Sequence, residues 1–94
     1  MNILIVDDDT GLLDQLKTAL KRKNYGVEIA ENGEQALDKI FDVSYDLVLL
    51  DIMLPRMDGL SVLKEVRKAG MDMPILMLTA RSDVQDKVKG LDHG

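Results

Sequence analysis

The stretch that decides the fold is Ile3-Leu4-Ile5-Val6-Asp7-Asp8-Asp9. Its apolar part is too short for a helix and too continuously apolar for a half-exposed strand, so it predicts a strand buried on both faces. The pattern recurs twice, because residues 47–50 run into Asp51 and residues 75–78 run into Thr79. If the three runs are neighbouring parallel strands, their ends converge and bring carboxylates and a hydroxyl into one crevice.

The segment after the first strand carries a helical pattern. Apolar residues recur at helical spacing over residues 12–20, and Asp9 or Thr10 could cap that helix. Residues 24–26, which include a glycine, are expected to end it. Apolar and polar residues then alternate over residues 27–29, as in a strand with one more solvent-exposed face at the edge of a sheet.

Three further helices are expected. The second should begin at Asn32, the third after a loop at residues 55–59, and the fourth at Ser82, which opens a capping-box match. Their predicted buried residues are Ala36, Leu37, Ile40 and Phe41, then Leu60, Leu63 and Val66, then Val84, Val88 and Leu91. Strict alternation of strand and helix predicts an α/β fold with a parallel sheet, right-handed crossovers and helices on its faces.

Composition narrows the class of protein. Ninety-four residues with 46% hydrophobic content suit one compact domain over residues 1–94. The net charge of −5 argues against a broad nucleic-acid-binding face, and the basic run at residues 21–23 is expected to be a solvated helix end. The absence of cysteine excludes disulfides and a thiolate site. No apolar run approaches the roughly 20 residues of a membrane span and no signal-peptide pattern follows Met1, so a cytoplasmic, soluble domain is expected.

The expected strand ends gather oxygen ligands. Parallel sheets bind ligands beyond the carboxyl ends of their strands, where the strand order reverses, and Asp7, Asp8, Asp51 and Thr79 fall at those ends. Crowded carboxylates are unfavourable unless a cation or a proton compensates them. Oxygen ligands without His or Cys favour Mg²⁺ before Ca²⁺. Because Mg²⁺ leaves positions for phosphate oxygens, the pattern points to phosphoryl chemistry.

Each site residue also has a simpler interpretation. One member of the Asp7–Asp9 triplet suffices as a helix cap, and at most two of the three can face the crevice. Asp51 could merely end a strand, although Asp is a poor strand residue; as a nucleophile it would form an acyl phosphate. Thr79 could be a turn residue or a donor to a phosphoryl oxygen. Asp58 is expected to cap the third helix, and His93 is assigned no catalytic role.

The chain resembles the receiver domain of bacterial two-component response regulators, most closely the winged-helix transcription-factor branch. Residues 3–9, 51–59, 78–80 and 90–94 carry the resemblance, which covers the whole chain in order and spacing. It implies a flavodoxin-like, doubly wound parallel sheet. It also implies phosphorelay signalling, in which Asp51 accepts a phosphoryl group from a sensor histidine kinase or a small phosphodonor.

The resemblance implies a role for each site residue. Asp8 and Asp51 would bind Mg²⁺ directly, Asp7 would act mainly through water, and the backbone carbonyl of Met53 would complete the protein ligands. Thr79 would be the switch hydroxyl that moves toward the acyl phosphate and shifts a two-state surface. Such a domain catalyses at most its own phosphorylation and dephosphorylation and is not a turnover enzyme. It would control transcription, and contact DNA, only through an output domain outside this chain.

The chain departs from the family pattern at its C-terminal end. A receiver normally continues into a fifth strand, which carries a lysine followed by proline, and a fifth helix. Residues 1–94 therefore match a truncated (βα)4 fragment of the (βα)5 fold, and Lys87 and Lys89, on the expected fourth helix, cannot be assumed to replace that lysine. Phosphorylation, or its coupling to a conformational change, is expected to be impaired. The strand at residues 75–79 should be an exposed apolar edge that favours self-association.

Three other functions fit parts of the pattern. A haloacid-dehalogenase-like phosphatase requires Asp-x-Asp-x-Thr/Val, but Gly11 stands at the fifth place. A flavodoxin-like flavin binder needs a Ser/Thr/Gly-rich phosphate loop where this chain has an acidic one. A non-phosphorylatable interaction module, or an engineered scaffold fragment of a receiver, is the third alternative because the lysine is absent.

Overall fold

In a computed structural model, strands and helices alternate along the part of the chain that the structure describes, residues 1–54 and 56–78. The elements are β1 (Asn2–Val6), α1 (Thr10–Lys21), β2 (Gly26–Ala30), α2 (Gly33–Asp42), β3 (Leu47–Asp51), α3 (Gly59–Lys68) and β4 (Ile75–Leu78). The predicted alternation is confirmed over these ranges. Thr79 and the predicted fourth helix lie outside the described residues.

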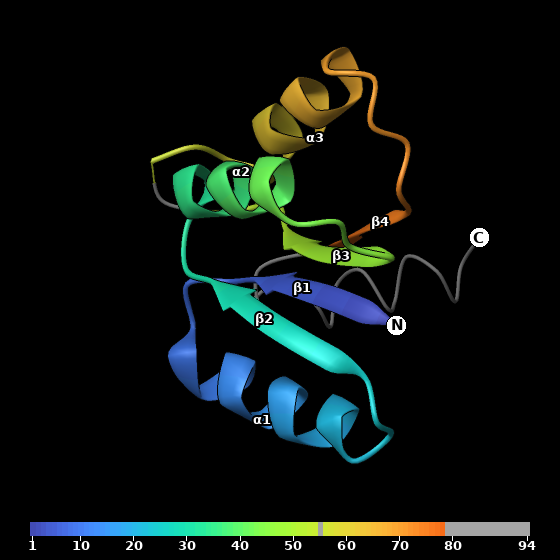
Figure 1. The fold of residues 1–94 in the computed structure, drawn as a ribbon. Coiled ribbons are helices and arrows are strands. Elements are labelled where there is room, and N and C mark those ends of the chain that lie inside the picture. The colour runs from blue at the N-terminus through green and yellow to red at the C-terminus, as the bar shows by residue number, and fades with distance from the viewer. Residues whose placement is uncertain (55, 79–94) are drawn as a thin grey trace, which may run out of the picture.

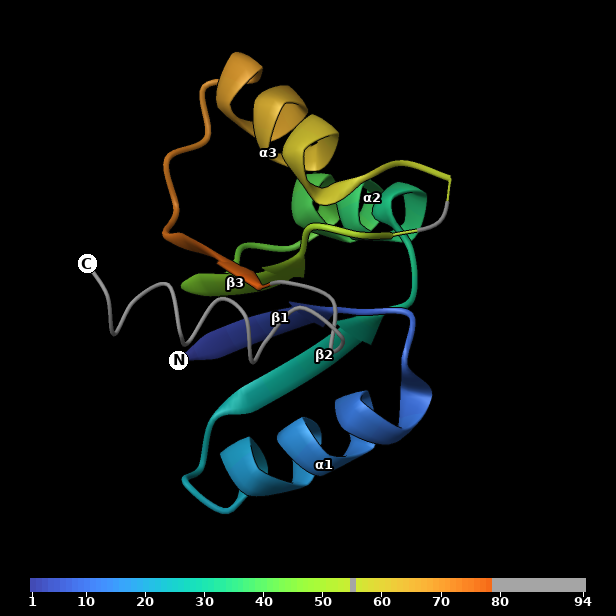
Figure 2. The same ribbon diagram turned by 180° about the vertical axis from the view of Figure 1, so that it is seen from behind.

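The four strands form one parallel sheet in the order β2-β1-β3-β4. The strand order reverses between β1 and β3, because the chain first adds β2 on one side of β1 and then crosses to add β3 on the other. Helix α1 covers one face of the sheet, and α2 and α3 cover the opposite face (Figures 1 and 2). The predicted doubly wound, flavodoxin-like arrangement is confirmed, as is the edge position of β2.

The side chains of β1 alternate between two hydrophobic cores. Ile3 and Ile5 pack with Leu13 of α1 on one face. Leu4 and Val6 pack with residues of α2 and α3 on the other face. All four strand residues are at most 2% exposed, which confirms the predicted strand buried on both faces. A central parallel strand has this composition because both of its faces are covered by helices.

Two predicted core residues are exposed instead. Phe41 of α2 is 53% exposed and Leu60 of α3 is 60% exposed. The buried stripes run at i, i+4 spacing through Ala36 and Ile40 in α2 and through Val62 and Val66 in α3. Leu37 and Leu63 beside these stripes are partly buried against the same core, so each apolar face is broad and the packing direction decides which residues at its margin are exposed. The prediction for Phe41 and Leu60 was wrong for this reason.

The helix caps follow the sequence. Asp9, Asn32 and Asp58 precede α1, α2 and α3, and each side chain accepts a hydrogen bond from a backbone N–H of the first turn. These caps were predicted at Asp9 or Thr10, at Asn32 and at Asp58. Gly26 was expected in the turn after α1, but it is the first residue of β2, because Asn24 (φ 65°) already takes the left-handed conformation of that turn.

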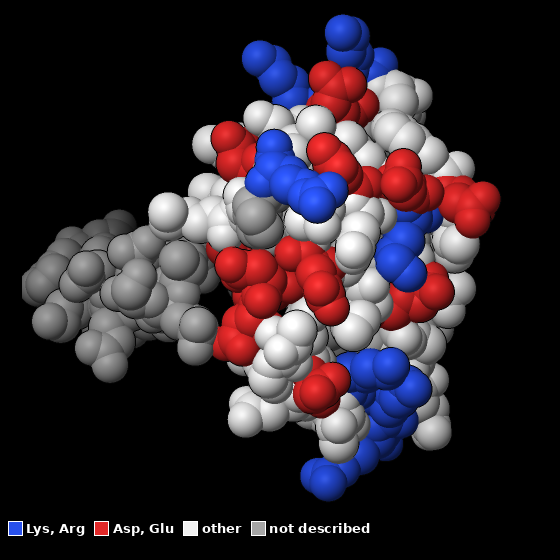
Figure 3. Space-filling view, turned by 90° about the vertical axis from the view of Figure 1, so that its left-hand side faces the viewer, with Lys and Arg blue, Asp and Glu red and all other residues white. Residues whose placement is uncertain are grey.

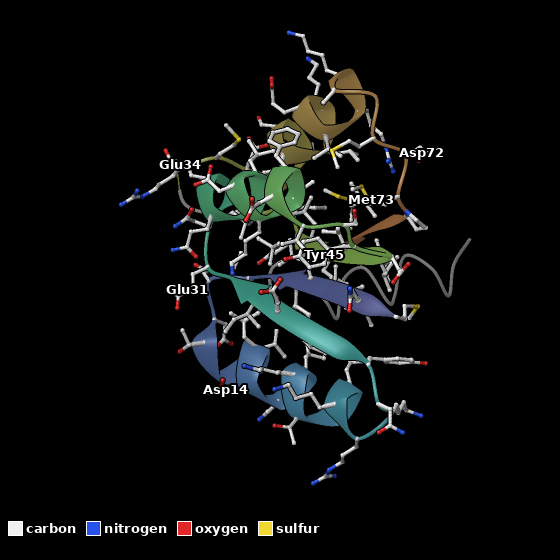
Figure 4. All side chains as sticks on the ribbon, in the orientation of Figure 1. Asp14, Glu31, Glu34, Tyr45, Asp72 and Met73 are labelled. Atoms are coloured by element: carbon white, nitrogen blue, oxygen red, sulfur yellow. The ribbon has the colours of Figure 1, made fainter. Side chains whose placement is uncertain are left out.

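Tyr45 connects the edge strand to the loop before β3. Its ring is buried between α2 and the sheet (Figure 4), and its hydroxyl donates a hydrogen bond to the carboxylate of Glu28 on β2. Burial raises the pKa of the Tyr45 hydroxyl, and the bond to Glu28 raises it further. This contact joins the middle of β2 to the residues before β3, away from the strand ends that carry the acidic residues. Among the described helices, none is long and apolar enough to cross a membrane.

Candidate functional site

The site lies at the carboxyl ends of β1 and β3, on either side of the point where the strand order reverses. Val6 pairs with Leu50, so Asp7 and Asp51 follow equivalent positions of neighbouring strands. Carboxylate oxygens of Asp7, Asp8 and Asp51 all lie within 4.8 Å of one another. Figure 3 looks onto this end of the sheet and shows acidic side chains gathered near the centre of the view. The structure thus brings together the three aspartates named from the sequence.

Asp7 is buried, with 4% of its surface exposed. Its backbone N–H donates to the carbonyl of Ala30 at the end of β2 (3.1 Å), and its Oδ1 accepts the N–H of Asp9 (2.9 Å). Burial raises the pKa of the Asp7 carboxyl, the bond from Asp9 opposes that rise, and the charge of Asp8 adds to it. The carboxylate is held in place, but its charge is poorly solvated.

Asp51 is the second buried carboxylate, with 2% of its surface exposed. Its Oδ1 accepts the N–H of Met53 at 3.1 Å. Burial raises the pKa of the Asp51 carboxyl; the bond from Met53 lowers it, and the charges of Asp7 and Asp8 raise it. Asp8 itself is exposed and faces the same crevice. The crevice therefore holds two buried carboxylates and one solvent-exposed carboxylate.

No positive side chain among residues 1–54 and 56–78 forms an ion pair with these aspartates; the ion pair within that part joins Arg56 to Glu34. Three mutually repelling carboxylates with only oxygen donors fit a hard divalent cation, which would offset both the burial of charge and the repulsion that raise the two pKa values. An open side at Asp8 leaves room for water or phosphate oxygens, as Mg²⁺ requires. The residues present therefore fit a magnesium ion.

Two other predicted site groups have a weaker structural basis. Met53 lies two residues after Asp51 and is 60% exposed; metal ligation by its carbonyl stays a prediction. Thr79 lies outside the described residues. Leu78, the residue before it, pairs with Asp51 at the end of β4.

Sequence reasoning missed two glycines that shape the loop after β3, residues 52–58. A Cβ on Gly59 would lie 2.3 Å from the carbonyl oxygen of Asp51, and a Cβ on Gly33 would lie 2.3 Å from the carbonyl oxygen of Met57. Both glycines are buried at the first residue of a helix. The sequence did contain a signal: each glycine directly follows a helix cap, Asn32 or Asp58, at a position where capping does not require glycine.

Comparison with known proteins decides the family. Residues 3–94 match the model of the family described as response regulator receiver domain. The chain belongs to this family. Its curated relatives include the transcriptional regulatory protein DltR of Streptococcus agalactiae, with 49% identity over the whole chain. They also include the response regulator MprA of Mycolicibacterium vanbaalenii, with 47% identity over the whole chain. The chain spans 42% and 41% of these two relatives.

Solved structures of receivers have the same fold. The receiver domain of the Francisella response regulator 1452 aligns with a TM-score of 0.81 and 32% identity, over 99% of this chain and 77% of that one. The response regulator TrrA of Thermotoga maritima, in a complex with Mg²⁺-BeF, aligns with a TM-score of 0.79 and 46% identity, over 88% of this chain and 76% of that one. The receiver fold and the membership in two-component response regulators predicted from the sequence are confirmed.

Proposed function

We propose that this receiver accepts a phosphoryl group on Asp51 in a reaction that depends on Mg²⁺. The observation that carries the proposal is the cluster of Asp7, Asp8 and Asp51 within 4.8 Å at the reversal of the strand order. A relative with 46% identity forms a complex that contains Mg²⁺, which supports the choice of metal.

Asp51 is suited to be the acceptor because one of its oxygens is already fixed. Oδ1 accepts the N–H of Met53, which orients the carboxylate for attack on phosphorus by its other oxygen. The new oxygen–phosphorus bond forms as the bond from phosphorus to the donor breaks, and the donor leaves with that electron pair. For a kinase donor the leaving atom is an imidazole nitrogen of phosphohistidine.

Asp7 and Asp8 prepare the site for this attack. Asp8 and Asp51 would hold Mg²⁺ directly, with the Met53 carbonyl, and Asp7 would act through bound water. The ion, when bound, neutralises part of the negative charge that accumulates on the phosphoryl group. Because burial raises the pKa of Asp51, a cation beside it also favours the ionised form, which is the nucleophile.

The wider role follows from the relatives. A sensor histidine kinase is the proposed donor, and an output domain outside this chain would carry the contact with DNA, as DltR is a transcriptional regulatory protein. The chain is proposed to act in the cytoplasm and to turn over no substrate beyond its own phosphoryl group. Thr79 is proposed as the switch hydroxyl.

Intact mass spectrometry tests the acceptor. The chain is incubated with Mg²⁺ and a small phosphodonor, and wild type should gain one phosphoryl adduct that chelation of Mg²⁺ prevents. Asp51→Asn should abolish the adduct. Asp58→Asn is the matched control, because Asp58 is an exposed aspartate that caps α3 and Asn caps a helix about as well; it should keep the adduct.

Other outcomes would point elsewhere. An adduct that persists in Asp51→Asn contradicts the proposal. Release of phosphate well beyond one equivalent would favour a phosphatase. A folded wild type, by circular dichroism, that gains no adduct would favour the interaction module named above.

Self-association is a second candidate function with its own observation. Within the described residues β4 is an edge strand, and its Leu76 is 56% exposed. An exposed apolar edge can pair with another chain. We therefore propose that the chain self-associates through β4. Sedimentation at tens of micromolar should show dimers or larger species that Leu76→Lys reduces, and a monodisperse wild-type monomer would contradict this candidate.

A further inference from the structure

The junction of β2 and α2, residues 30–34, contacts the residues that follow β1 and β3 without contributing a carboxylate to the acidic site. The carbonyl of Ala30 accepts the backbone N–H of Asp7 (3.1 Å). Three residues later, Gly33 is buried against Met57 in the loop that follows Asp51. One short segment therefore supports the end of β1 on one side and the β3–α3 loop on the other.

Gly33 is needed for space, not for backbone freedom. It does not take a positive φ, so its conformation is open to any residue. A Cβ at this position would lie 2.3 Å from the carbonyl oxygen of Met57 and 2.8 Å from its Cβ, and real Cβ contacts essentially never fall below 3.0 Å. Either the helix or the loop would have to move by about 0.7 Å or more to accept an alanine.

The start of α2 is the rigid partner in this contact. Asn32 Oδ1 accepts the N–H of Gln35 (2.9 Å), and Gln35 Oε1 accepts the N–H of Glu31 (3.0 Å), so both the cap and the residue before it are bonded to the first turn. The helix is also fixed to the sheet through Ala36 and Ile40. Figure 4 shows Glu31 and Glu34 on either side of this helix start, at the same end of the molecule as the carboxyl ends of the strands.

The described residues of the loop, 52–54 and 56–58, are the less constrained partner. Met53 and Arg56 are exposed, and Arg56 has a positive φ of 69°. The loop is tied at its two ends, where Met53 N–H bonds Asp51 Oδ1 (3.1 Å) and Gly59 N–H bonds the carbonyl of Ile52 (2.8 Å). A displacement forced at Met57 can therefore reach Ile52 through Asp58 and the Gly59–Ile52 hydrogen bond, and from Ile52 its neighbours Met53 and Asp51.

The exposed ion pair near the same contact does not set the position of the loop. Arg56 Nη1 lies 3.3 Å from Glu34 Oε2, with the two side chains 66% and 58% exposed. Such pairs contribute little in water. The close packing of Gly33 on Met57, which leaves no room for a side chain, sets the position of the loop.

We propose that Gly33 is a positioning residue for the magnesium and phosphoacceptor site: it sets the distance between α2 and the β3–α3 loop and so places Met53 and the Asp51 carboxylate. This inference rests on the proposed function. Groups that orient metal ligands from outside typically change metal affinity by about 10-fold to 100-fold when altered. Gly33→Ala should therefore weaken Mg²⁺ binding by about 10-fold.

The test compares Gly33→Ala with Gly70→Ala in the full chain. Gly70 has a φ of +82° and open space around it, so alanine there destabilises the fold through the backbone and leaves the loop after β3 untouched. Mg²⁺ affinity by isothermal titration calorimetry, Mg²⁺ dependence of adduct formation and the urea midpoint are measured for each. Gly33→Ala should raise the Mg²⁺ dissociation constant and the half-saturating Mg²⁺ concentration together, whereas Gly70→Ala should lower only the urea midpoint. Glu34→Gln should change Mg²⁺ affinity by less than about twofold, as expected for an exposed pair.

Two results would overturn this inference and leave the proposed function standing. One is a Gly33→Ala protein that binds Mg²⁺ within about twofold of wild type; the other is an equal loss of affinity in Gly70→Ala. If Gly33→Ala cannot be purified folded, Met57→Gly probes the same contact from the loop, because it removes the Cβ that lies against Gly33; unchanged Mg²⁺ affinity there also overturns the inference. A wild type that is folded but neither binds Mg²⁺ nor gains an adduct overturns the proposed function itself, and the inference with it.

Discussion

The turn after β1 and the loop after β3 each deliver a buried aspartate to the same crevice, but they are held in different ways. Both begin with the same local bond, since Asp7 Oδ1 accepts the N–H of Asp9 and Asp51 Oδ1 accepts the N–H of Met53. After β1, the helix cap Asp9 follows almost at once. After β3, residues 52–57 intervene before the cap Asp58. The turn is therefore fixed by bonds between near neighbours, and the loop is fixed by contacts with Gly33 and with the backbone of β3 itself.

The difference teaches which substitutions each half of the site can accept. A locally bonded turn loses stability when its own side chains change. A loop packed against other backbone loses stability when a neighbouring glycine gains a side chain. The substitutions below test that distinction, beginning with the largest expected effect.

Gly59→Ala should be the most damaging change. The new Cβ would lie 2.3 Å from the carbonyl oxygen of Asp51 and 2.8 Å from the Cα of Ile52, both of them backbone atoms that cannot rotate away. Overpacking of this kind destabilises by about 1–3 kcal/mol, and we expect the upper end. Urea denaturation measures the change. Gly11→Ala is the matched change in the turn, where the nearest atom, an oxygen of Asp9, would be at 3.4 Å; a loss there as large as at Gly59 would refute the distinction.

Neutralising either buried carboxylate should stabilise the protein in the absence of Mg²⁺. The folded-state pKa values of Asp7 and Asp51 are raised, so the folded state binds protons more readily than the unfolded chain. Their contribution to the free energy of unfolding is therefore highest at low pH. It falls as the pH rises from the unfolded value of about 3.9 through the raised folded value, and it stays low above it.

Asp51→Asn and Asp7→Asn should each remove part of that fall in stability and so raise the unfolding free energy at pH 7. Asp8→Asn, at an exposed position, should have a smaller effect. Urea midpoints at pH 4 and pH 7 in a chelating buffer measure the difference. Mg²⁺ should stabilise wild type more than either buried variant, and equal stabilisation of all three would contradict the shared site.

The sequence predicted the turn after β1 better than the loop after β3, for a physical reason. The cap at Asp9 and the burial of Ile3 to Val6 depend on residues a few positions apart, so the local pattern contains the information. The proximity of Asp7 to Asp51 followed from the rule that parallel strands present their carboxyl ends together. These features needed no knowledge of packing.

The loop depends on a contact between residues far apart in the chain. Gly33 and Met57 meet only because α2 and α3 lie on the same face of the sheet. The sequence around either residue does not predict this contact. The same limit explains the exposed Phe41 and Leu60. The apolar face of each helix is broad, and tertiary packing decides which residues at its margin are left exposed.

Asp9→Ala should lower stability by about 1 kcal/mol, the usual loss for a helix N-cap. Asp9 Oδ1 accepts the N–H groups of Gly11 (3.0 Å) and Leu12 (3.3 Å), and alanine leaves both without that partner. Asp9→Asn keeps the acceptor and should retain most of the stability. Thermal or urea unfolding distinguishes them. If the alanine variant matches wild type, the turn is not held by its local bonds as argued.

The smallest expected effect on stability comes from the backbone conformation at Arg56 in the loop. Arg56 has a φ of 69°, a region in which a Cβ is unfavourable by about 1 kcal/mol and glycine is not. Arg56→Ala and Arg56→Gly both remove the exposed pair with Glu34, so their difference reports the backbone alone. We expect the glycine variant to be the more stable of the two by about 0.5 kcal/mol, after the extra freedom of glycine in the unfolded chain is counted. In the turn after β1, Asp8 has no positive φ, so Asp8→Gly should be less stable than Asp8→Ala. Urea midpoints of the four variants measure both differences, and the same sign at the two positions would show that the loop is no more strained than the turn.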